Sequence, residues 1–228
     1  MPATPSDLAR LDRDHHLHPF TDPKVLQDDA PIVMAGGKGS TLWDEDGKLY
    51  LDALAGLWCV NVGYGRRELA EVARQMEQLA YYNTFFKTTT APTAALAAKL
   101  AELMPDGLGH VVFANSGSEA LDTIVRFSRL FWELKGKPDK KVMIGREEGY
   151  HGSTLATISL GGTVAMHAQG GLPLAGFAHV DTAYQFRHGQ PGESAEAFAE
   201  RAAGWVEAKI LELGADTVAG VVVEPVQG

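Results

Sequence analysis

The chain has 228 residues, a formal net charge of −9 and one cysteine. Its acidic balance argues against a surface that binds nucleic acid or an anionic membrane, because such surfaces carry a basic patch. One cysteine cannot form an internal disulfide, and no apolar run approaches the roughly 18 residues that a membrane-spanning helix needs. The first residues mix acids and bases and lack the apolar stretch of a signal peptide. A cytoplasmic globular protein is therefore expected.

The N-terminal part predicts an arm followed by a hairpin and two helices. The first forty residues are rich in Pro, Asp and His and have weak periodicity, which favours an extended arm with short elements. Two alternating runs then surround Asp46-Gly47, which is a hairpin signal. Apolar residues recur at helical spacing from Arg67 to Leu79. A further helix is predicted from Pro92 to Leu103, because proline is accepted in a first helical turn.

From His110 onward, short apolar strands alternate with helices. The predicted strands are 110–114, 141–145, 176–181 and 217–228, and the predicted helices are 115–136, after an initial turn, and 194–213. A glycine-rich loop is predicted after the second strand. This pattern predicts an α/β fold with an open, mostly parallel sheet and flanking helices, in which ligands bind beyond the carboxyl ends of the strands. The expected organisation is an arm and hairpin segment over residues 1–65, and a large domain over residues 66–228.

The first candidate site follows the predicted strand at 110–114. Ser116 and Glu119 have the spacing of a capping box, and that spacing alone favours a plain helix cap. Gly117 and Ser118 add a second interpretation. Glycine lets a ligand approach the backbone, and serine hydroxyls with free N–H groups hold a phosphate at the positive end of a helix. The segment matches neither a P-loop nor a dinucleotide-binding glycine motif.

Two further candidates follow later strands. Tyr150 and His151 stand between glycines, and Tyr150 is either a loop aromatic or a ring that stacks on an aromatic cofactor. His151 is then a neighbour of that ring or a hydrogen-bonding support, and not a metal ligand. Glu224 ends an apolar strand just before Pro225. It is either a solvated acid or a carboxylate at the ligand-binding edge of the sheet.

Aromatic residues in the N-terminal part have simple structural interpretations. Trp58 is more often a core residue than a ligand contact, and Cys59 has no adjacent base, which favours a buried, inert thiol. Phe85 and Phe86 stand together in a polar loop, and burial of both within one subunit is not expected. A subunit interface would resolve that conflict.

Three histidines lie close together near the N-terminus, at His15, His16 and His18. They suggest a metal, but no acid or cysteine is recognised at ligand spacing to them. They are therefore interpreted as a structural segment, and no metal is expected.

Together these motifs resemble the class III aminotransferases of pyridoxal-phosphate (PLP) fold type I. The order SGSEA, then YHG, then EPVQG is the family's order. Within the class, the chain closely resembles the ω-amino acid:pyruvate transaminases, in the segments HHLHPFTD, AGLWCVNVGYGR, YNTFFKTT, GYHGSTLATISLGG and MHAQGGLPLAGFAH. The resemblance covers essentially the whole chain. It implies the N-terminal part of the family's PLP-binding large domain, preceded by the arm and hairpin.

The resemblance also implies roles for the candidate residues. The implied cofactor-binding residues are Ser116, Gly117, Ser118, Tyr150, His151 and Glu224. The two serines and the glycine would hold the phosphate, the tyrosine would stack on the ring, and the glutamate would lie near the ring's 3-oxygen. The implied substrate-binding residues are Phe20, Trp58, Phe85, Phe86 and Tyr150. The two loop phenylalanines would reach a partner's pocket, since the family forms homodimers with active sites at the interface.

The family's catalytic groups are expected beyond Gly228. These are an aspartate that pairs with the pyridinium nitrogen, the Schiff-base lysine and a carboxylate-binding arginine. The expected reaction of the complete protein is transfer of an amino group from an ω-amino acid or amine to pyruvate, with the cofactor as electron sink. We expect that these 228 residues alone do not transaminate.

Two other interpretations stay open. Another class III enzyme, of the ornithine, 4-aminobutyrate or glutamate-semialdehyde type, is disfavoured by the LWCVNVGYG and NTFFKTT segments. A non-catalytic remnant that binds phosphate, or that pairs with a partner chain, is favoured by the missing lysine.

Overall fold

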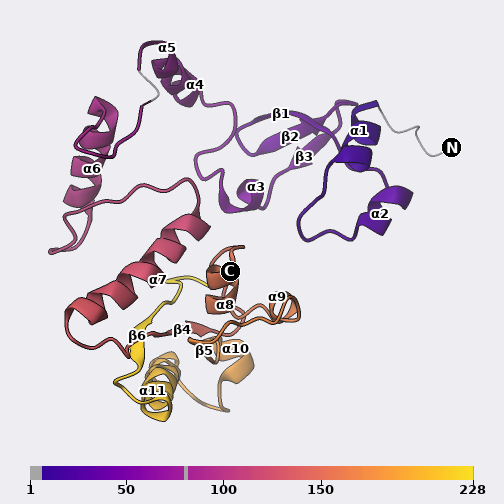
Figure 1. Cartoon of the computed structure of the whole chain (residues 1–228). Coiled ribbons are helices and arrows are strands. Elements are labelled where there is room, and N and C mark those ends of the chain that lie inside the picture. Colours follow the sequence, from indigo (N-terminus) through magenta and orange to yellow (C-terminus); the bar gives the residue numbers. More distant parts are fainter. Residues whose placement is uncertain (1–6, 80–81, 228) are drawn as a thin grey trace. The chain divides into compact units, whose positions relative to one another are not determined.

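The structure, a computed structural model, describes residues 7–79 and 82–227. Its backbone divides into two compact units, residues 1–94 and 95–228, which are described separately below (Figure 1). In the described part of the chain, no helix is both long and apolar enough to cross a membrane. The predicted boundary at residue 65 refers to the family's domains and stays a prediction.

The first unit contains short helices and a three-stranded antiparallel sheet in the order β1-β2-β3. Its elements are α1 (Asp7–His15), α2 (Pro23–Asp28), β1 (Met34–Lys38), β2 (Thr41–Asp44), β3 (Leu49–Leu51), α3 (Ala55–Trp58), α4 (Arg67–Ala73) and α5 (Gln75–Gln78). The hairpin predicted around Asp46-Gly47 is confirmed, since β2 and β3 pair antiparallel. The predicted helix from Arg67 to Leu79 is broken at Arg74 and ends at Gln78.

Strand β1 was not predicted, because its sequence MAGGK lacks the β-branched alternation that indicates a strand. Its glycines have a packing reason. A β-carbon at Gly36 would lie 2.4 Å from the Trp43 ring, so the absence of a side chain lets that ring lie against β1.

The second unit contains a three-stranded parallel sheet in the order β5-β4-β6. Helix α6 (Ala91–Leu103) crosses the division between the units. The other elements are α7 (Gly117–Leu134), β4 (Val142–Arg146), α8 (Leu155–Leu160), α9 (Val164–His167), β5 (Phe177–Val180), α10 (Gln185–His188), α11 (Ala195–Leu213) and β6 (Val218–Val221). The predicted parallel α/β sheet and the helices α6, α7 and α11 are confirmed.

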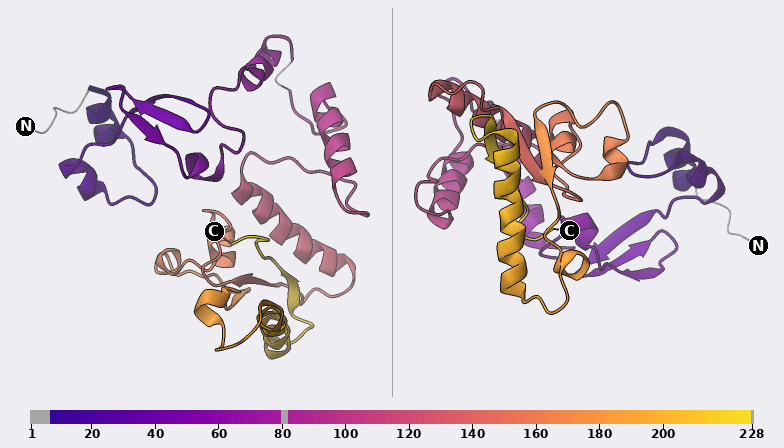
Figure 2. Two further views of the ribbon diagram at one scale, coloured as in Figure 1. Left: turned by 180° about the vertical axis from the view of Figure 1, so that it is seen from behind. Right: turned by 90° about the horizontal axis from the view of Figure 1, so that it is seen from below.

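The central strand β4 carries the core of this unit. Met143 and Ile144 are 1% and 0% exposed and point to opposite faces, because side chains alternate along a strand. Met143 packs with Val125 of α7 and Leu160 of α8. Ile144 packs with apolar residues of α11. The sheet is therefore covered by α7 and α8 on one face and by α11 on the other (Figures 1 and 2).

Three predictions in this unit are wrong in part. Residues 110–114 form no strand, because no described strand lies beside them to pair with their backbone groups. The loop predicted after β4 contains the short helices α8 and α9. The last strand ends at Val221, although Val222 still donates its N–H to the Ile144 carbonyl oxygen at 2.8 Å.

Candidate functional site

Three segments of the second unit meet beyond the carboxyl end of β4. They are the start of α7, the loop at 147–154 that follows β4, and the chain at 222–227 that follows β6. Hydrogen bonds join the loop to each of the other two segments. This is the edge of a parallel sheet at which ligands bind.

The start of α7 presents open N–H groups. Ser116 is the N-cap residue, and its hydroxyl oxygen accepts the Glu119 N–H at 3.2 Å. In a capping box the Glu119 carboxylate would accept the N–H of the N-cap residue, Ser116. Here it accepts the N–H of the preceding residue, Asn115, at 2.8 Å. The N–H groups of Gly117 and Ser118 lie in the first turn, where no intrahelical acceptor exists. A β-carbon at Gly117 would meet no atom within 4 Å, which leaves room for a bound anion.

The loop after β4 packs directly on this helix start. Ser153 donates its N–H to the Ser118 hydroxyl oxygen at 3.0 Å. Gly152 has φ +138°, and a β-carbon there would lie 2.4 Å from the same hydroxyl oxygen. Only glycine fits at this approach. The loop and the helix start are therefore held in one fixed arrangement.

Glu224 and His151 leave two buried polar atoms unpaired. Glu224 Oε1 accepts the Tyr150 N–H at 2.9 Å, whereas Glu224 Oε2 and His151 Nε2 have no hydrogen-bond partner among the described residues. Both atoms lie on one side of Gly149, where a β-carbon would meet them at 3.2 and 3.7 Å. Burial lowers the pKa of His151, and the Glu224 carboxylate opposes this shift in part. Burial therefore favours the neutral imidazole, and the two atoms form an unpaired polar pair beneath the surface beside Gly149.

The Tyr150 ring is open to solvent, with 56% of the residue exposed. Its backbone, by contrast, is fixed through the bond to Glu224. An exposed aromatic ring on a fixed backbone is suited to stacking on a planar ligand.

A cavity of about 550 Å³ adjoins Glu224 and contains polar groups that the sequence analysis missed. Thr182 donates its hydroxyl to Gln227 Oε1 at 2.8 Å, and Gln227 Nε2 donates to the Glu147 carbonyl oxygen at 2.9 Å. Arg146 also lines this cavity. The positions of Thr182 and Arg146 at or just after the ends of β5 and β4 were the signal that could have identified them.

Four of the five residues expected in the substrate pocket lie in the first unit, and all four are exposed, whereas Tyr150 lies in the second unit. The exposed fractions of Phe20, Trp58, Phe85 and Phe86 are 78%, 66%, 67% and 94%. The interpretation of Trp58 as a core residue is therefore wrong. Phe20, Trp58 and Phe86 also have positive φ angles of 53°, 70° and 55°. Such strain in a non-glycine residue costs free energy, and it clusters at functional sites.

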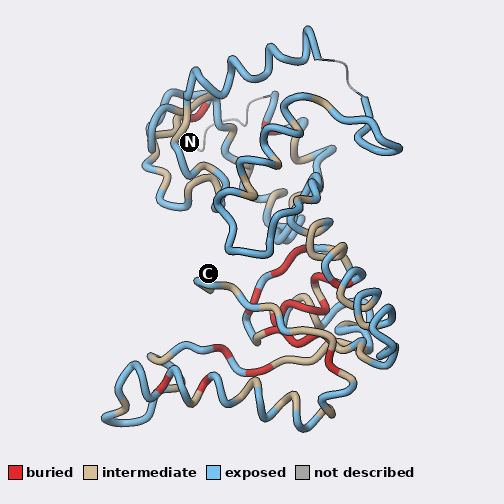
Figure 3. Tube along the Cα trace, turned by 90° about the vertical axis from the view of Figure 1, so that its left-hand side faces the viewer, coloured by how far each residue is buried: buried red, intermediate tan, exposed pale blue. Residues whose placement is uncertain are grey.

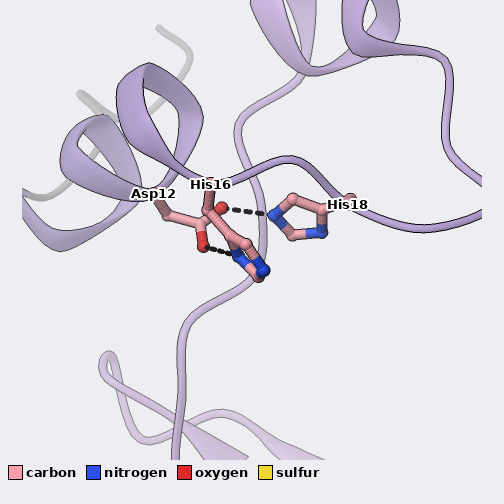
Figure 4. A group of neighbouring side chains, drawn as sticks. All are labelled: Asp12, His16 and His18. Atoms are coloured by element: carbon pink, nitrogen blue, oxygen red, sulfur yellow. Dashed lines mark hydrogen bonds and ion pairs between the residues drawn. The ribbon is translucent and has the colours of Figure 1, made fainter.

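Two other interpretations of the N-terminal part are corrected. Cys59 is exposed and not buried, and its thiol lies 2.9 Å from the Gly56 carbonyl oxygen. An acid does lie near the histidines: Asp12 bonds His16 at 2.8 Å and His18 at 2.6 Å (Figure 4). Asp12 lies four residues before His16, a helical spacing that could have identified it, whereas its contact with His18 depends on how the chain turns after α1.

The sequence matches the family described as "Aminotransferase class-III" over residues 24–228. Among curated proteins, it is 49% identical over 220 residues to the putrescine–pyruvate aminotransferase of Pseudomonas aeruginosa, covering 96% of this chain and 48% of that protein. It is 41% identical to γ-aminobutyrate transaminase 3, chloroplastic, of Solanum lycopersicum, covering 93% of this chain and 41% of that protein. The chain thus spans about half the length, or less, of these relatives.

Solved structures of ω-transaminases are also similar to this chain. The (S)-enantioselective ω-transaminase of Thermomicrobium roseum matches with a TM-score of 0.91 and 42% identity, over 97% of this chain and 49% of its own. The ω-transaminase of Pseudomonas jessenii in complex with PMP (pyridoxamine phosphate) matches with a TM-score of 0.93 and 39% identity, over 98% of this chain and 49% of its own. The chain therefore belongs to the class III aminotransferases.

Proposed function

We propose that the complete protein uses PLP to transfer an amino group from an ω-amino acid or amine to pyruvate. The observation that carries this proposal is the arrangement around Gly149: an open helix start and two unpaired buried atoms, His151 Nε2 and Glu224 Oε2, in segments joined by hydrogen bonds. The putrescine–pyruvate aminotransferase at 49% identity supports pyruvate as the acceptor.

The residues present fit this cofactor. Gly117 and Ser118 at the positive end of α7 would hold a phosphate, because their N–H groups and the empty space beside Gly117 face outward. Tyr150 would cover a face of the ring. Glu224 would lie on the side of the ring's 3-oxygen and hold the loop through the Tyr150 N–H, with His151 as its buried neighbour. When bound, PLP supplies an electron sink for the carbon that carries the amino group.

The aromatic residues of the first unit support an interface role for the substrate pocket. Phe86 is 94% exposed, and its backbone has a strained, positive φ angle. Both features cost free energy, and both are expected where a ligand or a second subunit covers the ring. A thermostable ω-transaminase variant engineered for asymmetric synthesis of bulky amines, 39% identical to this chain, has a tryptophan, a phenylalanine and an arginine replaced. We therefore assign Phe20, Trp58, Phe85 and Phe86 to the amine pocket of a homodimer.

Binding of pyridoxamine phosphate by the chain tests the cofactor site, because this amine form cannot react with surface lysines. We expect Ser118→Ala to weaken binding about tenfold, since a hydrogen bond to a charged group is lost. Ser194→Ala is the control: this serine also accepts a backbone N–H near the start of a helix, that of Ala197 at 3.2 Å, but it lies at α11, away from the site. Equal binding of pyridoxamine, which lacks the phosphate, would contradict the assignment.

Turnover by the complete protein tests the reaction. We expect ω-amino acids or putrescine to be consumed with pyruvate as acceptor, and the same donors to react poorly with 2-oxoglutarate. The reverse preference would identify a class III enzyme of another type. Turnover by the 228-residue chain alone would contradict the expectation that the complete protein is required.

A further inference from the structure

A cluster of possible metal ligands lies in the first unit, on the segment that leads to Phe20. Asp12 stands on α1, which ends at His15, and the chain then turns so that His16 and His18 both face the Asp12 carboxylate (Figure 4). His16 Nδ1 is 2.8 Å from Asp12 Oδ1, and His18 Nε2 is 2.6 Å from Asp12 Oδ2. Each oxygen of the Asp12 carboxylate is thus hydrogen-bonded to one imidazole nitrogen.

The three side chains lie near enough for modest shifts to bring one atom of each onto a single ion. One ligand atom from each residue can be chosen so that all lie within 4.8 Å of one another. Ligand atoms around a tetrahedral zinc ion, at bond lengths of about 2.0–2.1 Å, are roughly 3.3 Å apart. The side chains of Asp12, His16 and His18 are 28%, 59% and 27% exposed, so small shifts are cheap and solvent reaches the cluster.

We propose that Asp12, His16 and His18 form a binding site for a divalent transition metal ion, with zinc as the expected occupant. Two neutral imidazoles and one carboxylate are a ligand set that zinc accepts, with water in the fourth position. In the metal-free state each imidazole donates an N–H to one oxygen of the carboxylate. On binding, that proton moves to the other ring nitrogen or leaves to water, and a nitrogen lone pair forms the bond to the metal.

The ion would link the end of α1 to the turn that carries Phe20. Without it, hydrogen bonds between partly exposed side chains make this link, and such bonds exchange with water. Bound zinc should therefore slow amide hydrogen exchange across residues 16–20. This inference does not depend on the proposed transamination, because it concerns residues of the first unit alone.

Titration of the chelator-treated chain with ZnCl₂ in a calorimeter tests the site, and CoCl₂ reports the geometry, because tetrahedral cobalt absorbs strongly in the visible range. We expect one ion per chain. His16→Ala, His18→Ala and Asp12→Asn should each weaken binding about tenfold or more. The matched controls are His15→Ala, which removes a neighbouring histidine, and Asp14→Asn, which removes another carboxylate of α1; both should bind like the parent chain.

Several results would overturn the proposal. They are an absence of saturable binding, a stoichiometry above one, or equal losses from His15→Ala and His18→Ala, as an unspecific histidine-rich segment would give. Unchanged binding by Asp12→Asn would have the same meaning, because the carboxylate distinguishes this site from a pair of surface histidines. Circular dichroism of each variant confirms that a loss of binding is not a loss of folding.

Discussion

The two units of the chain are stabilised by different interactions. The second unit has two apolar clusters on opposite faces of β4, and most buried residues of the described chain belong to it (Figure 3). Among the described residues of the first unit, Ala9 is the only apolar residue that is buried. Large side chains such as Leu51 and Trp58 are more than 60% exposed. Burial of apolar surface therefore explains the fold of the second unit and not that of the first.

Aspartates organise the first unit instead. Asp44 accepts the Tyr50 hydroxyl at 2.7 Å and two backbone N–H groups of the hairpin turn. Asp52 accepts the Tyr64 hydroxyl at 2.8 Å and the N–H groups of Leu54 and Gly56. These bonds fix the turns while leaving apolar side chains at the surface. A unit built in this way presents its apolar residues to a ligand or partner, which is what the proposed function requires of it.

The largest expected effect is in the apolar core. Ile144→Ala should destabilise the second unit by about 3 kcal/mol, because it leaves a cavity between β4 and α11. Urea denaturation followed by circular dichroism measures the loss. Ile124→Ala is the matched control: Ile124 is 47% exposed, and its replacement should cost under about 1 kcal/mol. Equal losses would mean that β4 does not carry the core.

The next largest effect is expected from the polar framework of the first unit, which is the set of hydrogen bonds to Asp44 and Asp52. Asp52→Ala should speed amide hydrogen exchange across residues 52–64 and leave residues 142–146 unchanged, because three hydrogen bonds are lost in one unit only. Tyr64→Phe removes one of the three and should have a smaller effect in the same region. Faster exchange in both units would show that the two are not independently stabilised.

The same framework should weaken in acid. The Tyr64 hydroxyl, followed by backbone N–H groups, holds the pKa of Asp52 below its ordinary value of 3.8. A carboxyl group with a lowered pKa in the folded state stabilises the fold above its unfolded pKa, and this contribution is lost as the pH falls through the folded pKa. Protection from exchange at residues 52–64, measured relative to the intrinsic amide rate at each pH, should therefore fall below pH 4. Asp52→Asn should remove most of this dependence.

Local signals in the sequence predicted the regular elements but not the contacts between them. The hairpin at Asp46-Gly47 and the helix after Ser116 follow from turn and capping chemistry within a few residues, and both are confirmed. The bond from Ser153 to Ser118 spans 35 positions, and no local pattern indicates it. The prediction of a strand at 110–114 is wrong for a related reason, because a strand forms only where a neighbouring strand can pair with it.

Besides the contacts between elements, the sequence does not indicate which apolar side chains are exposed to solvent. Tryptophan is usually well buried, yet Trp58 is 66% exposed, and the described residues of the first unit form no apolar cluster that could receive its ring. The alternating apolar pattern of a hairpin predicts a buried face, but it does not say which surface covers that face. The proposed function places the exposed ring of Trp58 in the amine pocket, so a core-based interpretation and the proposed function differ at this residue.

The smallest effect concerns an ion pair at the edge of the second unit. Arg201 donates to both Glu193 carboxylate oxygens, at 2.7 and 2.8 Å, and this pair lowers the pKa of Glu193 to about 2. The stabilisation is therefore complete above pH 4.5 and is lost as the pH falls towards 2. Glu193→Gln should lower the urea midpoint at pH 7, and the difference from the parent chain should shrink as the pH falls towards 3.

The matched control is Glu212→Gln, which breaks an exposed pair with Lys209 on the same helix, α11. An exposed pair at helical spacing contributes little, so this variant should behave like the parent chain at every pH. If Glu193→Gln also has no effect, polar bonds in the second unit are dispensable and its stability rests on the β4 core alone. A loss from Glu193→Gln as large as that from Ile144→Ala would instead remove the contrast between the two units, because both would then depend on carboxylates.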